Sequence, residues 1–121
     1  MSDDAKPKRL PDELPPLPTA FARTHPEVWE AYRRLGKACS QAGPLDGRTR
    51  RLVKLAFALA IGSEGAVHSH VRRGLAEGLA ADELLHVATL AIPTVGWPNA
   101  LAGRSWIEDL AGTGGDAEVR P

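Results

Sequence analysis

His70 is the residue of this sequence best placed to carry out proton chemistry. It lies in the segment 63–73, where many of its neighbours are small or apolar. A histidine has an unperturbed pKa of about 6.5, so it can give and take a proton at neutral pH as a general acid or base. If the segment is helical, Ala66 and Gly74 share the side of His70, because residues four apart are neighbours on a helix. These small residues would leave room for a ligand beside the imidazole ring.

Further residues are candidates for binding a ligand near His70. Arg73 and Ser63 share the helical side of His70, and a guanidinium there would hold a carboxylate. Trp97 marks a turn between two expected helices, and Asn99 would either cap the second helix or offer an amide to a ligand, provided that this turn lies over His70. We therefore predict a site with His70 as the catalytic group and with substrate contacts from Arg73, Ser63, Ala66, Gly74, Trp97 and Asn99.

Each of these interpretations has a structural alternative. His70 can be a partly buried histidine that is hydrogen-bonded to Glu77 or to a backbone carbonyl. A tight corner between two helices explains the segment 96–98 without any ligand. A basic cluster opens the preceding helix, and such a cluster is typical of a solvated face or an ion-pair surface, which makes it a minor candidate for contact with an anion. Its members are Arg48, Arg50, Arg51 and Lys54.

The histidines do not indicate a metal site. His68 and His70 lie two positions apart, so on a helix their rings point to nearly opposite sides, roughly 200° apart. They cannot bind one ion as a helical pair. A metal at His70 would need Glu64 or His86 to approach it from elsewhere, and the spacing of a known metal site is absent from the sequence. We therefore expect no metal ligands.

The elements that must position these residues are all helical. Apolar residues recur at helical spacing, strand-like alternation is absent from the sequence, and Thr24, Asp46 and Ser63 are suitable N-caps. The predicted fold is all-α, with about five helices. The helices are expected over 24–42, from 46 to 62, from 63 to 78, through 84–91 with an end before Pro93, and from about 98 to 112.

Composition limits the kind of protein. The 121 residues suffice for one domain, and the 15 basic and 15 acidic residues balance, so we expect neither nucleic acid nor a membrane as a partner. The longest apolar run is far shorter than a membrane span, and the N-terminus has no apolar signal region. These features predict a cytoplasmic protein. Cys39 is the only cysteine, so an internal disulfide and a thiol pair for redox turnover are both excluded.

The ends of the chain differ in composition from its middle. Six of the ten prolines fall between residues 7 and 26, which predicts a proline-rich extended arm over 1–22. Residues 23–112 form the expected helical domain, and 113–121 a flexible tail. The folded part is small, so a single copy would bury only a modest core, and self-assembly would add to it.

Several segments together resemble the carboxymuconolactone decarboxylase family over about residues 26–112. They are LDGRTRRLVKLA (45–56), GLAADELLHVATLA (78–91) and VGWPNA (95–100). Gly65-Ala66, His70, Val71 and Arg72 match the Gly-Ala-x-x-x-His-Val-Arg pattern of its decarboxylase-like branch. The AhpD-like branch of alkylhydroperoxidases instead carries a CxxC thiol pair and a glutamate on the preceding helix. Those positions fall here on Ser63, Ala66 and about Arg51.

The resemblance implies an AhpD-like helical bundle that assembles as a trimer or hexamer. It also implies a lyase of aromatic catabolism that decarboxylates a small carboxylated, lactone-type substrate without a cofactor, with His70 moving the proton. Two alternatives remain open. The protein would be an AhpD-like peroxidase or antioxidant protein only if Cys39 worked with a partner thiol. It would otherwise be a non-catalytic oligomer that binds a ligand between its helices.

Overall fold

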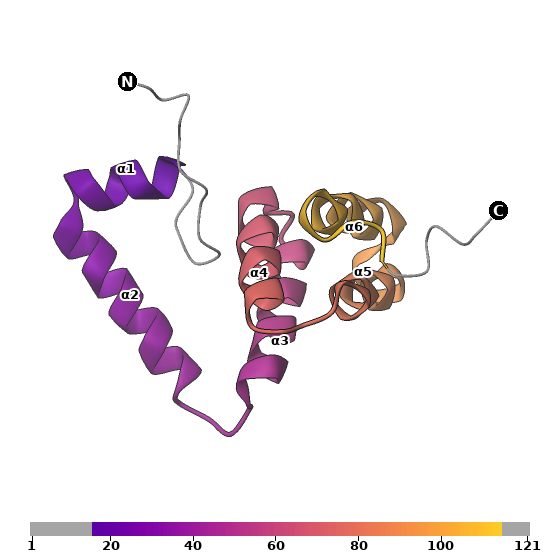
Figure 1. Ribbon diagram of the computed structural model, residues 1–121, viewed down its shortest axis with the longest axis horizontal. Helices are drawn as coiled ribbons and strands as arrows, with labels where there is room; N and C mark the ends of the chain where they lie inside the picture. Colours follow the sequence, from indigo (N-terminus) through magenta and orange to yellow (C-terminus); the bar gives the residue numbers. More distant parts are fainter. Residues whose placement is uncertain (1–15, 115–121) are drawn as a thin grey trace. The chain divides into compact units, whose positions relative to one another are not determined.

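The computed structural model of the protein describes residues 16–114, which form α-helices and no strands (Figure 1). The all-α prediction is confirmed. The described part contains six helices: α1 (Pro16–Thr24), α2 (Pro26–Ser40), α3 (Gly47–Ala60), α4 (Glu64–Ala76), α5 (Ala81–Val95) and α6 (Trp97–Ala111). None of these helices is long and apolar enough to cross a membrane. The expected arm over 1–15 and tail over 115–121 lie outside the described residues.

The chain divides into two units, 1–44 and 45–121, and the first contains α1 and α2. Residues 16–22 belong to helix α1, whereas an extended arm was expected there, and this is why the structure has one helix more than predicted. Thr24 also differs from the expectation that it caps the next helix. Its hydroxyl donates back to the carbonyls of Ala20 and Phe21 in α1, so α2 begins after His25 instead.

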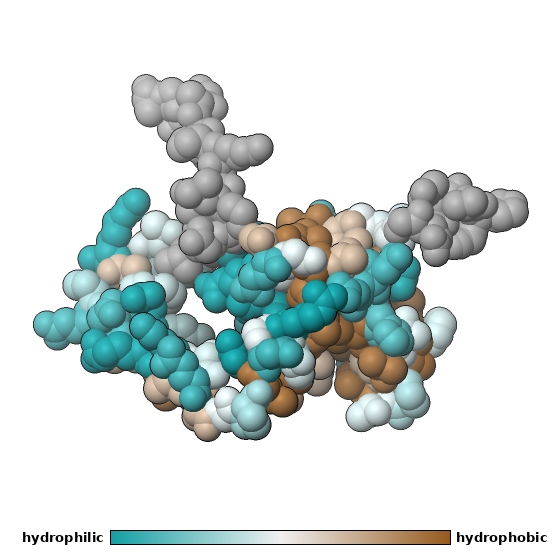
Figure 2. All heavy atoms as spheres, turned by 60° about the horizontal axis from the view of Figure 1, so that its bottom comes forward, coloured by the Kyte–Doolittle hydropathy of each residue, from teal (hydrophilic) through white to brown (hydrophobic). Residues whose placement is uncertain are grey.

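The second unit consists of two pairs of helices. In Figure 1, α3 and α4 lie side by side, and α5 and α6 form a pair that is seen nearly end-on, so the two pairs cross steeply. The apolar residues that the pairs share form the core; its largest fully buried side chains are Leu55, Leu59, Val67, Val71, Leu84 and Ile107. Apolar side chains also reach the surface of this unit (Figure 2).

The helices that carry the candidate site begin where the sequence indicates. Asp46 accepts a hydrogen bond from the backbone N–H of Thr49 at the start of α3, and this bond lowers the pKa of the Asp46 carboxyl. The Ser63 hydroxyl likewise accepts from the N–H of Ala66 at the start of α4. The two predicted caps are confirmed, and they fix the register in which α3 presents Arg51 and α4 presents His70.

The end of α5 differs from the prediction, because Pro93 lies inside the helix. Proline removes a single backbone bond, the one to the carbonyl of Thr89. Both residues are exposed, so water can satisfy that carbonyl and the helix continues to Val95. Gly96 then turns the chain with a φ of +106°, a conformation that side chains rarely adopt, and α6 starts one residue earlier than expected, at Trp97.

A close approach of two helices depends on Gly103 of α6. A Cβ atom at this position would lie 2.3 Å from Cγ of Leu59 in α3, which is far inside normal contact. Leu59 is buried, so it has little space to move away. The absence of a side chain at residue 103 therefore lets α6 pack directly on the core of α3.

Candidate functional site

His70 contacts a guanidinium that comes from the neighbouring helix. Nη1 of Arg51 in α3 lies 2.7 Å from Nδ1 of His70 in α4. A guanidinium can only donate hydrogen bonds, so Nδ1 of the imidazole is the acceptor. The neutral ring consequently carries its proton on Nε2, which can donate a hydrogen bond but cannot accept one.

Arg51 is itself held by Glu77, just beyond the end of α4. Nε of Arg51 donates to Oε1 of Glu77 at 3.0 Å, and Nη2 donates to Oε2 at 2.8 Å. Two parallel bonds of this kind fix the plane of a guanidinium. The side chain of Arg51 is only 14% exposed, and the bonds from Arg51 are the main cause that lowers the pKa of the Glu77 carboxyl. Arg51 is therefore an oriented group that bridges a carboxylate and the imidazole.

The surroundings of His70 keep its ring neutral. The pKa of His70 is lowered to about 4, chiefly by burial and then by the positive charges of Arg51, Arg73 and Lys54, while Glu77 opposes them. At neutral pH the ring is therefore uncharged. The expectation of a histidine with an ordinary pKa, ready to exchange protons near pH 7, does not hold for this environment.

The space beside Gly74 is filled by side chains of the protein, whereas the sequence predicted room for a ligand there. A Cβ atom on Gly74 would lie 3.4 Å from Cγ of Arg51 and 3.2 Å from side-chain atoms of both Leu79 and Leu84. The glycine is buried. Its small size thus accommodates the stem of Arg51 and the packing of the chain after α4, rather than leaving room for a ligand beside the ring of His70.

Arg73 has a buried N–H group whose hydrogen bond is not satisfied within the described part of the chain. Its Nε is buried and has no hydrogen-bond partner among residues 16–114. Its charge acts on both His70 and Glu77, so it lies in the same electrostatic environment. A buried N–H without a partner is costly, and a carboxylate or enolate oxygen would satisfy it.

The other predicted contacts have separate positions. Ser63 is the N-cap of α4, and Ala66 packs against the core. Trp97 and Asn99 lie exposed in the first turn of α6, and the hydrogen bonds of the described residues link neither of them to His70. The corner at Gly96 accounts for the turn itself. A role for these four residues in binding a substrate stays a prediction.

The sequence pattern places Arg51 in a basic cluster and does not link it to His70. Arg48 of the same cluster fits the interpretation of the cluster as an ion-pair surface, because it pairs with Glu83 at the start of α5. A signal for Arg51 existed in the sequence. It stands 19 residues before His70, at about the position that the resemblance gives to the glutamate of the AhpD-like branch, and the structure brings Arg51 to the histidine.

The fold and the site together define an all-helical protein in which a neutral histidine is surrounded by basic side chains. The sequence model of the carboxymuconolactone decarboxylase family matches residues 26–109, and the chain belongs to that family. No curated protein is similar enough to the chain to count as a match.

Proposed function

We propose that the protein binds a small carboxylated, lactone-type molecule at His70 and releases carbon dioxide from it without a cofactor. The observation that supports this proposal is the combination of a neutral imidazole with the positive charges of Arg51, Arg73 and Lys54. Those charges oppose a second proton on His70. For the same electrostatic reason they favour an anion beside the ring.

The position of the positive charge decides whether it speeds the reaction or only binds the substrate. During decarboxylation the negative charge leaves the carboxylate and moves into the unsaturated lactone as an enolate. A cation that contacts only the carboxylate stabilises the bound substrate and does not lower the barrier. A cation beside the enolate oxygen stabilises the transition state more than the substrate. Arg73, with its unpartnered Nε, is the group we assign to this task.

His70 takes the role of a hydrogen-bond donor in this proposal. Its Nε2–H would donate to the developing enolate oxygen, while Arg51 holds the opposite nitrogen and thereby fixes the tautomer. The bond between the substrate carbon and its carboxylate breaks, the electron pair delocalises into the lactone, and carbon dioxide leaves. A proton from solvent then adds to the carbon. This role replaces the general acid and base expected from an ordinary pKa.

The test is an assay of carbon dioxide release and ultraviolet absorbance on a panel of carboxylated muconolactones and vinylogous β-keto acids. We expect turnover by the wild type, loss of about 100-fold or more in His70→Ala and in Arg73→Met, and no change in His86→Ala. His86 is a matched control because it is an exposed histidine on α5.

Circular dichroism of each variant establishes that it is folded before its activity is compared. Turnover that survives in folded His70→Ala would contradict the assigned role of this residue. Absence of turnover on every compound, together with binding of the same carboxylates by the wild type, would replace the decarboxylase with a ligand-binding protein.

A further inference from the structure

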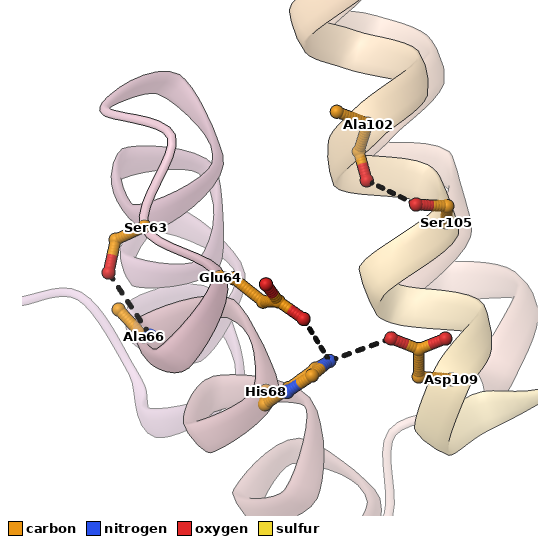
Figure 3. A network of polar contacts seen from close by, with 7 residues as sticks. All are labelled: Ser63, Glu64, Ala66, His68, Ala102, Ser105 and Asp109. Carbon is orange, nitrogen blue, oxygen red and sulfur yellow. Dashed lines mark hydrogen bonds and ion pairs between the residues drawn. The ribbon is translucent and has the colours of Figure 1, made fainter.

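A second polar cluster lies between α4 and α6 and involves the histidine that the proposed reaction does not use. His68 of α4 points toward Asp109 of α6, and Glu64 lies one turn before His68 on its own helix (Figure 3). Nε2 of His68 is 2.9 Å from Oδ2 of Asp109 and 4.0 Å from Oε2 of Glu64. The three possible ligand atoms all lie within 4.8 Å of one another.

Two carboxylates in this cluster face a nitrogen that has only one proton to donate. Nε2 of an imidazole carries at most one hydrogen, so it can donate to Asp109 or to Glu64 but not well to both. The two carboxylates face the same nitrogen, and even a protonated His68 leaves the cluster with a net negative charge. Converging like charges are unfavourable unless a further cation neutralises them. A divalent ion would bind all three groups and balance both carboxylates.

We propose that Glu64, His68 and Asp109 bind a first-row divalent cation such as Zn²⁺, and that this ion links α4 to α6. An imidazole among three ligands favours transition metals over Mg²⁺ and Ca²⁺, which prefer oxygen ligands alone. The site is separate from that of His70, because the side chains of His68 and His70 lie on nearly opposite sides of α4. This proposal departs from the sequence-based expectation of no metal ligands, because the partner that completes this cluster, Asp109, comes from a distant helix.

The geometry requires only a small adjustment of one side chain. Ligand atoms around a tetrahedral zinc lie about 3.3 Å apart, given bonds of roughly 2.0–2.1 Å. His68 and Asp109 are already close to this separation. Glu64 must approach by rotation about its side-chain bonds, and it can do so because its side chain is 57% exposed. The three protein ligands leave a coordination position for water.

The experiment is a titration of the full chain, without an affinity tag and stripped of metals, with ZnCl₂ by calorimetry and with Co²⁺ by visible absorption. We expect one Zn²⁺ per chain and the absorption bands of a low-symmetry Co²⁺ site. Loss of a ligand in His68→Gln, Asp109→Asn or Glu64→Gln should weaken binding by at least about ten-fold. His86→Gln also removes one of the four histidines, but outside this cluster, and should bind like the wild type.

A second measurement is thermal unfolding with and without Zn²⁺. A ligand that binds only the folded state raises the melting temperature, so the wild type and His86→Gln should be stabilised by the ion and the three ligand variants should not. The three variants replace exposed or half-buried side chains by polar ones of similar size, so each should fold, and circular dichroism in EDTA checks this. Absence of saturable binding by the wild type, wild-type affinity in His68→Gln, or weakened binding in His86→Gln would each overturn the proposal.

Discussion

At the scale of single residues, the charge of Arg51 adds to burial in lowering the pKa of His70. Arg51→Met removes a positive charge beside the imidazole and leaves Glu77, whose negative charge raises the pKa of His70, without its partner. Both changes favour the protonated ring, so we expect the pKa of His70 to rise from about 4 toward its ordinary value of 6.5. Nuclear magnetic resonance of the imidazole protons over a pH titration measures this directly.

Arg48→Met is the control for that titration. Arg48 pairs with Glu83 and is not among the charges that act on His70, so this variant should leave the pKa of His70 where it is in the wild type. An unchanged pKa in Arg51→Met would mean that burial and the remaining charges of Arg73 and Lys54 keep the ring neutral without Arg51. An equal rise in Arg48→Met would mean that the effect comes from net charge and not from the contact.

The prediction of His70 as the catalytic residue needed only local information, and it stays a prediction. The residue types near His70 and their spacing on one helix already indicated an unusual histidine. Its principal partner was not predictable in the same way, because Arg51 reaches His70 across two packed helices, at a separation of 19 residues. Periodicity describes the face of a single helix, and it contains no information on which face of another helix lies opposite. The lowered pKa of His70 was not predictable for the same reason, because it depends on burial in the fold and then on the charge of Arg51.

At the scale of elements, the starts of α3 and α4 were predictable because a cap is made within four residues. The junction of α1 and α2 was not, since Thr24 belongs equally well to the end of one helix or the start of the next, and its hydroxyl bonds to α1. The end of α5 was not predictable from Pro93 either, because the helix continues past this residue to Val95. The cost of a proline depends on whether the freed carbonyl is exposed, which is a property of the folded chain.

The packing of α6 on α3 leads to a pair of opposite predictions for two glycines. Gly103→Ala places a Cβ against buried Leu59, so we expect the free energy of unfolding to fall by about 1–3 kcal/mol. Gly65→Ala in the first turn of α4 meets no atom within 4 Å, and we expect it to be neutral or to stabilise by up to about 1 kcal/mol. Urea denaturation measures both. Equal effects of the two changes would show that α6 does not depend on this close approach.

At the scale of the whole molecule, several large apolar side chains are exposed within each of the two units that the structure describes. In α2 no residue is buried, and Val28, Tyr32 and Leu35 form a stripe whose members are 56%, 64% and 60% exposed. Phe57 and Ile61 of α3 are 64% and 77% exposed. Helices with an apolar face gain most of their stability from burying it. We therefore propose that the protein self-associates and that the stripe on α2 lies in the interface between copies.

Light scattering at micromolar concentration tests this proposal with one variant and one control on the same helix. The chain has a mass of 12.9 kDa, and we expect the wild type to have at least three times that mass as a trimer or a larger assembly. Leu35→Glu puts a charge into the apolar stripe and should shift the mass toward the monomer, because a carboxylate without a partner is costly to bury. Lys37→Glu also introduces a carboxylate, but on the opposite side of α2, and should keep the wild-type mass. A monomeric wild type would contradict self-association, and equal dissociation of both variants would place the interface elsewhere than on this stripe.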